Sequence, residues 1–245
     1  VNVPEYAEDT VAEGAFALMI ALAKKLQPMG RAMAAEGWLW PTARWMGVDL
    51  AAKTLGLVGV GRTGSRLARM AGAGFRMRVL GYDPHVSAAA MAAAGVEKQD
   101  DLPAMLAACD FVSIHAVLTP ETRRLMGAAE LAAMKPTALL INTARGALVD
   151  EGALLAALRE RRIAGAGLDV FAEEPLSKAH ALAALYAMDN VILTPHLTFF
   201  TAEAMARLEE ETLARSAEIL EGRPVTVKSR DPRLRAQTHG VAFEG

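Results

Sequence analysis

The chain has 245 residues, of which 53% are hydrophobic, and its formal net charge is −2. This length and composition allow one large domain, or one and a half ordinary ones, with an ample apolar core. The near-neutral charge, without a block of like charges, argues against nucleic acid or an anionic membrane as a partner. Cys109 is the single cysteine. As a small buried apolar residue without a disulfide partner, it fits a reducing cytoplasm.

The apolar stretch of residues 6–26 is predicted to contain the first helix, which Asp9 and Thr10 can cap and whose apolar residues run from Val11 to Leu26. Charged residues interrupt its apolar run, so it is too polar to cross a bilayer, and it has no signal-peptide layout. Apolar side chains still occupy most of its faces, so either a sheet or a second subunit must cover it. We expect this helix to mediate a homodimer.

Six short apolar runs alternate with predicted helices along the rest of the chain: 54–58, 79–82, 111–115, 138–142, 165–168 and 191–194. This alternation is typical of a parallel sheet covered by helices on both faces, which is an α/β fold. The handedness of the crossovers then favours a doubly wound, Rossmann-like sheet. Residues 201–220 form a last predicted helix, whose acidic residues 209–211 face solvent, and no structure is assigned to the tail after Gly222.

A glycine-rich turn follows the first apolar run and is the most informative motif of the chain. Gly59, Gly61 and Gly64 form the pattern G-x-G-x-x-G between a buried strand and a predicted helix over residues 65–73. The glycines allow a tight turn, close approach of a pyrophosphate and close packing of helix and strand. The helix N-terminus offers free N–H groups and a partial positive charge to phosphates. The sequence therefore predicts a dinucleotide-binding site.

Asp83 lies nineteen residues after Gly64, at the end of the second run. A carboxylate there can accept hydrogen bonds from the adenosine ribose hydroxyls and would repel a 2′-phosphate, which favours NAD over NADP. His85 and Arg62 are expected to lie near Asp83 and could soften this preference. The alternative interpretation is that Asp83 and Pro84 form a plain turn at the end of a strand.

Three groups near later strand ends suit hydride chemistry on a 2-keto acid. The guanidinium of Arg145 can bind a carboxylate in a forked geometry and polarise the adjacent ketone. His196 could deliver the proton to the ketone oxygen. Glu174 could bind the far nitrogen of that imidazole, which would fix its tautomer and raise its basicity. A surface arginine in a polar turn and a structural histidine are the alternatives.

Asp169 closes the fifth run, where it could hold the nicotinamide end of the cofactor or simply cap a strand end. No metal site is predicted, because the five histidines lack ligand spacing with one another or with Cys109. A serine-nucleophile elbow is also absent from the sequence.

Several separate motifs stand in one order along the chain: residues 3–6 with 11–13, the glycine turn, 115–122, 142–146, 165–175 and 194–196. Together they resemble the D-isomer-specific 2-hydroxyacid dehydrogenase family, from about Val3 to about Pro224. Residues 198–201 and the Val-Pro-x-Tyr start are most similar to the D-lactate dehydrogenases of that family.

The resemblance implies an NAD-dependent D-2-hydroxyacid dehydrogenase that acts on a small, lactate-like 2-keto or D-2-hydroxy acid. In this reading Arg145 binds and polarises the substrate, Glu174 supports the histidine, and His196 is the proton donor and acceptor. Arg62 and Thr63 would contact the pyrophosphate.

The remaining cofactor contacts are also implied by the resemblance. Asp83 would bind the adenosine ribose. The adenosine side would be lined by Ala116, Val117 and Thr122, and the nicotinamide would be bracketed by Thr143, Ala144 and Asp169.

The sequence departs from the family pattern in three respects. Gly14 stands where the family usually has histidine, and Val117 where proline is common. Family members also begin with a separate substrate-binding domain, and this chain enters at the hinge helix, so we expect that domain to be mostly absent. Residues 1–200 would then be the NAD-binding domain with its hinge and dimerisation helix. Residues 201–245 would be a helix and tail that return to the missing domain.

Two readings of function follow. The leading one is the dehydrogenase, although without the other domain to exclude water the chain is expected to bind NAD and turn over poorly. The other is a non-catalytic, NAD-responsive dimer, like the corepressors that share this fold. A formate-type dehydrogenase is disfavoured, because that relative has glutamine where Glu174 stands.

Overall fold

The computed structural model describes residues 5–227 and 241–243, which fall into two compact units. The larger unit is Ala12–Thr198. The smaller one joins the N-terminal residues, up to Val11, with the chain from Phe199 onward.

The larger unit contains a parallel sheet that, among the described residues, has seven strands in the order β3-β2-β1-β4-β5-β6-β7. The order reverses between β1 and β4, as a doubly wound sheet requires, so the predicted α/β, Rossmann-like fold is confirmed. The strands are β1 (Thr54–Val58), β2 (Arg78–Tyr82), β3 (Glu97–Lys98), β4 (Phe111–Ile114), β5 (Leu139–Asn142), β6 (Gly165–Leu168) and β7 (Val191–Leu193).

The strand register brings the carboxyl ends of the central strands side by side. Val58, the last residue of β1, is paired with Tyr82 of β2 and with Ile114 of β4. The next residues of all three strands therefore leave the sheet at one edge, which is where ligands bind in open α/β sheets.

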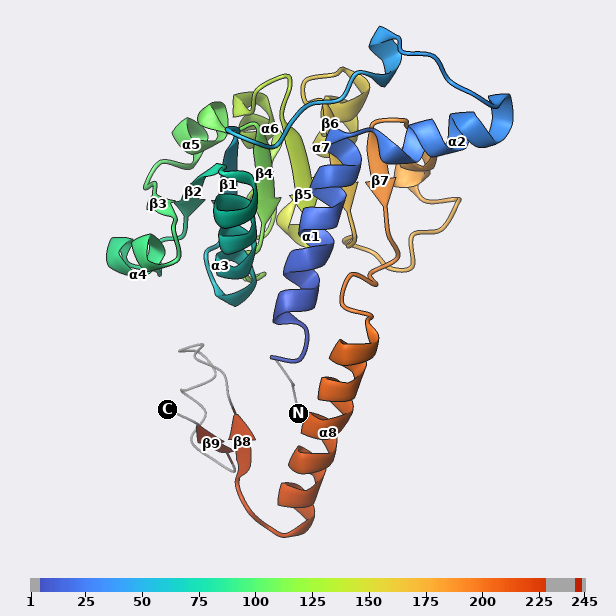
Figure 1. Cartoon of the computed structure of the whole chain (residues 1–245). Helices are drawn as coiled ribbons and strands as arrows, with labels where there is room; N and C mark the ends of the chain where they lie inside the picture. Colours follow the sequence, from blue (N-terminus) through green and yellow to red (C-terminus); the bar gives the residue numbers. More distant parts are fainter. Residues whose placement is uncertain (1–4, 228–240, 244–245) are drawn as a thin grey trace. The chain divides into compact units, whose positions relative to one another are not determined.

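Helices cover both faces of this sheet, and the buried residues form a separate core on each face. One core contains side chains of α1 (Glu8–Ala23), α3 (Arg62–Arg69), the π-helical turn η2 (Met70–Gly74) and α4 (Ala88–Ala93). The other contains side chains of α5 (Leu102–Ala108), α6 (Ala128–Ala133), α7 (Glu151–Arg159) and η4 (Ala181–Ala187). In Figure 1, α1 and α3 lie across one face of the sheet.

The first predicted helix ends earlier than expected, and a second helix that the sequence did not predict follows it. The helix α1 ends at Ala23, Lys25 has a left-handed backbone with φ of 51°, and α2 (Leu26–Glu36) begins directly after it. The prediction of Asp9 and Thr10 as the cap was wrong, because α1 begins one residue earlier, at Glu8.

The sheet itself covers the apolar face of α1. Ala12, Ala15 and Met19 are fully buried in the core on that face. A Cβ at Gly167 in β6 would lie 3.1 Å from Cβ of Leu18, so the helix and the strand are in close contact. This packing satisfies the need for a cover within the chain, without a second subunit.

The smaller unit is built on α8 (Ala202–Leu220), with Thr201 as its N-terminal cap. The tail, to which the sequence assigned no structure, contributes β8 (Val225–Val227) and β9 (Val241–Phe243), which pair in parallel. Glu218 is buried and accepts hydrogen bonds of 2.8 Å from both the amide and the hydroxyl of Thr226, which attaches β8 to the helix.

In the acidic run of α8, Glu209 and Glu210 are exposed as expected, whereas Glu211 is half-buried and lies 3.6 Å from Arg215. Among the described residues, no helix has the length and apolar character needed to span a membrane.

Substituting Gly167 with Val tests the packing of α1 on β6. The larger side chain would overlap Leu18, and overpacking of this kind costs about 1–3 kcal/mol of the free energy of unfolding. Urea denaturation measures the effect. Gly72→Ala is the matched control, since no described atom lies within 4 Å of a Cβ placed there. Equal stability of Gly167→Val and wild type would contradict this packing.

Candidate active site

The glycine turn lies between β1 and α3, and its three glycines have different surroundings. Gly59 has φ of +95°, and a Cβ there would lie 2.5 Å from the backbone nitrogen of Ala116. A Cβ at Gly64 would lie 2.5 Å from the carbonyl oxygen of Gly59. Gly61 caps α3, and no described atom lies within 4 Å of a Cβ placed there. Gly59 and Gly64 are thus needed for internal packing, whereas Gly61 leaves space beside the helix N-terminus.

The carboxylate of Asp83 is held against this turn. It accepts hydrogen bonds from the backbone nitrogens of Val60, at 3.0 Å, and His85, at 2.9 Å. The acid at the end of β2 is therefore placed beside the glycine turn at the end of β1, which is the arrangement that ribose binding requires.

His115 follows β4 and lies beneath the turn, where a Cβ at Gly64 would be 3.6 Å from its own Cβ. Its Nε2 is 2.8 Å from the hydroxyl of Ser113. The residue retains some solvent exposure, but removal of the imidazole from water lowers its pKa to about 4. His115 is therefore neutral near pH 7 and adds no positive charge to the turn. His115 was predicted only as the first residue of the 115–122 motif, without a role of its own.

The loop after β4 is folded on itself. The hydroxyl of Thr122 donates to the carbonyl of Val117 and accepts from the amide of Thr119, both at 2.7 Å. Ala116 lies directly against Gly59, whereas Val117 is 56% exposed. The three residues predicted on the adenosine side are thus on one compact loop next to the glycine turn.

Buried Asn142 organises the loop after β5. Its side chain donates to the carbonyl of Arg145, at 3.0 Å, and accepts from the amide of Ala144, at 3.1 Å. The Arg145 guanidinium donates to the carbonyl of Ala144, at 2.6 Å. The hydroxyl of Thr143 is buried and, within the described part of the chain, has no hydrogen-bond partner. Such an orphaned polar atom fits a site that a ligand completes.

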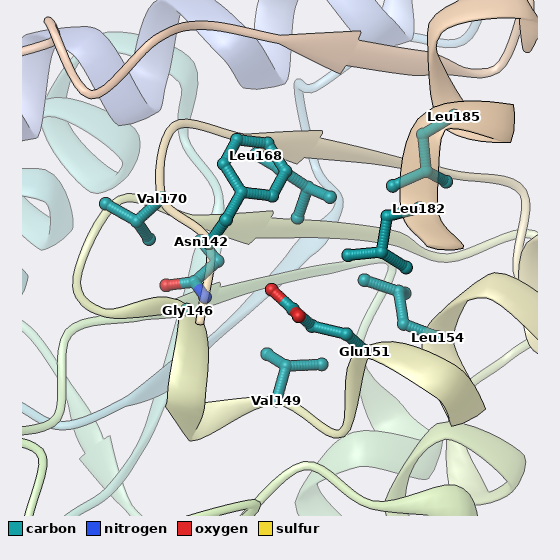
Figure 2. Close-up of a pocket in the computed structure, with 10 residues that line it drawn as sticks. Asn142, Gly146, Val149, Glu151, Leu154, Leu168, Val170, Leu182 and Leu185 are labelled. Carbon is teal, nitrogen blue, oxygen red and sulfur yellow. The ribbon is translucent and has the colours of Figure 1, made fainter. Parts of the chain in front are cut away.

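Gly146 joins this loop to the loop after β6, because a Cβ at Gly146 would overlap the backbone of Phe171. A small pocket beneath the two loops is lined mainly by apolar side chains, such as Leu154, Leu168 and Leu182 (Figure 2). The carboxylate of Glu151 also lines it. The pocket contains none of the predicted catalytic side chains, so it belongs to the packing behind the strand ends.

Glu174 and His196 form a direct pair between the segments that follow β6 and β7. His196 Nδ1 is 2.7 Å from Glu174 Oε2, and the second carboxylate oxygen accepts from the amide of Phe171, at 2.8 Å. Partial burial opposes ionisation of Glu174, but the hydrogen bonds from His196 and Phe171 outweigh it and hold the carboxyl pKa below its usual value. The pair is therefore a carboxylate bound to an imidazole. The spacing of the two residues in the sequence could not establish this contact.

Asp169 is buried at the end of β6 and is turned toward the loop that carries His196. Its carboxylate accepts from the hydroxyl of Thr194 and the amide of Leu197, and from both the amide and the hydroxyl of Thr198. The side chain is thus occupied by this loop.

The structure places the predicted residues on adjacent strand ends of one sheet edge. Arg145 follows β5, Glu174 follows β6, and His196 follows β7, in the spatial order of the strands. The direct contact among these three is the one between Glu174 and His196. Arg62 and Thr63 lie in the first turn of α3, which begins at Arg62.

The doubly wound sheet, the glycine turn at the reversal of strand order and the acid at the end of β2 define a dinucleotide-binding α/β protein. The family model of the D-isomer specific 2-hydroxyacid dehydrogenase NAD-binding domain matches residues 16–198. The chain belongs to this family, and its cofactor is NAD.

Among similar proteins, the D-3-phosphoglycerate dehydrogenase of Methanocaldococcus jannaschii is 41% identical over 83% of this chain and 38% of its own length. The glyoxylate reductase of Thermococcus litoralis is 40% identical over 85% of this chain and 63% of its own length. The chain therefore spans less than two thirds of these relatives. A solved D-lactate dehydrogenase from Aquifex aeolicus, complexed with NAD and lactic acid, matches with a TM-score of 0.82 and 32% identity. That match covers 90% of this chain and 68% of the other.

Alanine substitutions at Gly59 and Gly61 are expected to affect different properties, stability at Gly59 and NAD affinity at Gly61. Gly61→Ala should leave the free energy of unfolding unchanged, because the new Cβ meets no described atom, yet weaken NAD binding by about tenfold or more. Gly59→Ala should lose about 1–3 kcal/mol of stability, because its backbone is left-handed and its Cβ would meet Ala116.

Thermal or urea denaturation and NADH fluorescence titration measure the two effects, and each variant serves as the control for the other. Unchanged NAD affinity in Gly61→Ala would contradict a pyrophosphate position beside this turn.

Proposed function

We propose that this protein transfers hydride between NAD(H) and a small 2-keto acid, which it interconverts with the D-2-hydroxy acid. The observation that carries the proposal is the hydrogen bond between Glu174 and His196. This pair lies at the same edge of the sheet as the glycine turn, so a proton donor and a nucleotide site share one ligand-binding edge.

The chain's own residues would hold NAD as follows. The N–H groups at the start of α3, with Arg62 and Thr63, would bind the pyrophosphate, and Asp83 the adenosine ribose. The loop with Ala116, Val117 and Thr122 would line the adenosine side. Thr143, Ala144 and Asp169 would bracket the nicotinamide, and the orphaned hydroxyl of Thr143 supports this position. When bound, NADH supplies the hydride.

In the reductive direction, His196 would give a proton from Nε2 to the ketone oxygen as hydride reaches the adjacent carbon, and in the oxidative direction it would take that proton back. Nδ1 is engaged by Glu174, so the exchangeable proton is assigned to Nε2. The hydrogen bond to Glu174 fixes the orientation of the ring.

Arg145 would bind the substrate carboxylate through its guanidinium and polarise the neighbouring ketone. Its present bond to the carbonyl of Ala144 is made to a neutral acceptor. A carboxylate is the stronger partner for a guanidinium, so substrate binding is favourable at this position.

We propose a short, lactate-like acid as the substrate. The solved structures that resemble this chain include D-lactate dehydrogenases from Aquifex aeolicus and Lactobacillus jensenii. Other relatives are named for glyoxylate or phosphoglycerate, so the comparison of several acids is part of the test.

Replacing His196 with Ala should lower kcat by a factor of about 10² to 10⁴, the usual contribution of general acid–base catalysis. The affinity for NADH should change little, because the imidazole acts on the substrate. The measurement is NADH absorbance with pyruvate, glyoxylate and hydroxypyruvate.

Glu174→Gln and Glu173→Gln are the matched pair for this experiment, since Glu173 is the adjacent residue and its side chain is 81% exposed. Only Glu174→Gln should lower kcat. In the full-length protein, NADH binding without oxidation by any of the three acids would refute the proposed activity and indicate a binding module.

We also propose that the protein is a homodimer. The support comes from large apolar side chains on the segment after α2, where Trp38, Trp40 and Met46 are 75%, 75% and 73% exposed. Exposed apolar groups clustered in sequence are typical of protein–protein contacts. With α1 covered by its own sheet, this segment is the better candidate for the contact.

Analytical ultracentrifugation at micromolar concentration should detect a dimer in wild type and a shift toward monomer in Trp38→Ser/Trp40→Ser. A wild-type monomer under these conditions would count against the homodimer. The exposed position of both tryptophans means that the double variant should keep its fold, which circular dichroism can check.

A further inference from the structure

The backbone of His196 is in a conformation that few non-glycine residues adopt. Its φ is +57°, in the left-handed region. The loop from Thr194 to Thr198 must therefore be fixed by contacts outside itself. The orientation of the imidazole depends on the same contacts, because the side chain leaves the backbone at this position.

The carboxylate of Asp169 provides these contacts. Oδ1 accepts from the hydroxyl of Thr194, at 2.5 Å, and from the amide of Leu197, at 3.0 Å. Oδ2 accepts from the amide of Thr198, at 3.2 Å, and from its hydroxyl, at 2.6 Å. The donors lie on both sides of His196 in sequence, so the carboxylate clamps the loop around it. Thr198 supplies both of the donors to Oδ2.

The helix α1 makes room for Thr198 at this position. Gly14 lies inside α1, and a Cβ there would be 2.7 Å from Cβ and 2.9 Å from Cγ2 of Thr198. Glycine is unfavourable in a helix interior, so its presence here needs a local reason. The close approach of Thr198 gives that reason, since any other residue would displace the threonine from Asp169.

We propose that Thr198 is a positioning residue for His196. The missing side chain of Gly14 leaves the space that Thr198 needs to reach Asp169. The hydroxyl of Thr198 completes the set of hydrogen bonds on the buried carboxylate, and the filled set holds His196 in its left-handed conformation beside Glu174. Thr198 acts through the loop and does not touch the reacting atoms. Its effect on catalysis rests on the proposed dehydrogenase activity, but its effect on the imidazole does not.

Thr198→Val removes the hydroxyl and keeps the shape of the side chain, whereas Thr198→Ser keeps the hydroxyl. We expect Val to lower kcat about tenfold or more, with KM for the keto acid and affinity for NADH little changed, because misplacement of a catalytic group affects the chemical step. Ser should restore most of kcat. Thr137→Val, at an exposed turn before β5, is the matched control and should behave as wild type.

Nitrogen-15 NMR of the imidazole gives a readout that needs no turnover. Thr198→Val should shift or broaden the His196 ring signals, and Thr198→Ser should restore them, while the signals of Thr137→Val match wild type. Unchanged ring signals in a folded Thr198→Val protein would overturn the proposal. If no keto acid is reduced, the proposed function fails, yet this NMR comparison still decides the role of Thr198.

The match between Gly14 and Thr198 has its own test. Gly14→Ala should destabilise the protein and change the His196 ring signals as Thr198→Val does. Addition of Thr198→Gly should recover part of the lost stability, because it removes both atoms that the new Cβ would meet. Gly30→Ala in α2, where no described atom lies within 4 Å of the new Cβ, is the control and should not destabilise. Strictly additive effects on stability would show that the two positions are independent and would overturn their pairing.

Discussion

The arrangement of the site depends on one constraint, the alignment of parallel strand ends at a single edge of the sheet. Backbone hydrogen bonds carry this alignment past the last strand residues, from Gly59 to Tyr82 at 2.9 Å and from His115 to Val58 at 2.7 Å. The glycine turn, Asp83 at the end of β2 and the loops with Arg145, Glu174 and His196 all begin from this edge. Buried strands fix the edge, and the loops vary the chemistry on it.

Two residues of this edge, Gly59 and His196, have a positive φ, as do Lys25, Arg76 and others elsewhere in the chain, and Asp169 buries a carboxylate beside His196. The rest of the sheet is regular, with continuous buried strands and a core on each face. Strained positions of this kind persist only where neighbouring contacts determine them fully, and here the contacts are backbone amides and hydroxyls of adjacent strand ends.

The sequence could predict the fold because strands buried on both faces read as continuous apolar runs, as in Phe111–Ile114 and Leu139–Asn142. It could not predict β3, since Glu97–Lys98 is a polar pair at the sheet edge. The exact end of α1 before Lys25 was also missed, because Pro28, the nearest break signal, lies inside the first turn of α2. The pairing of Glu174 with His196 was a hypothesis from chemistry alone. The clamp on Asp169 was inaccessible, because half of its donors are backbone amides, which carry no signal in the sequence.

The hydrogen bonds also separate the groups that are fixed in advance from those that have capacity for a ligand. Asp169 and Glu174 have both oxygens engaged by the chain, so they serve as supports whose geometry is set before any ligand arrives. The hydroxyl of Thr143 has no hydrogen-bond partner among the described residues, and no described atom lies within 4 Å of a Cβ placed at Gly61. A site built in this way orders its charged supports during folding, so ligand binding is spared that entropic cost and catalysis gains from groups already in place.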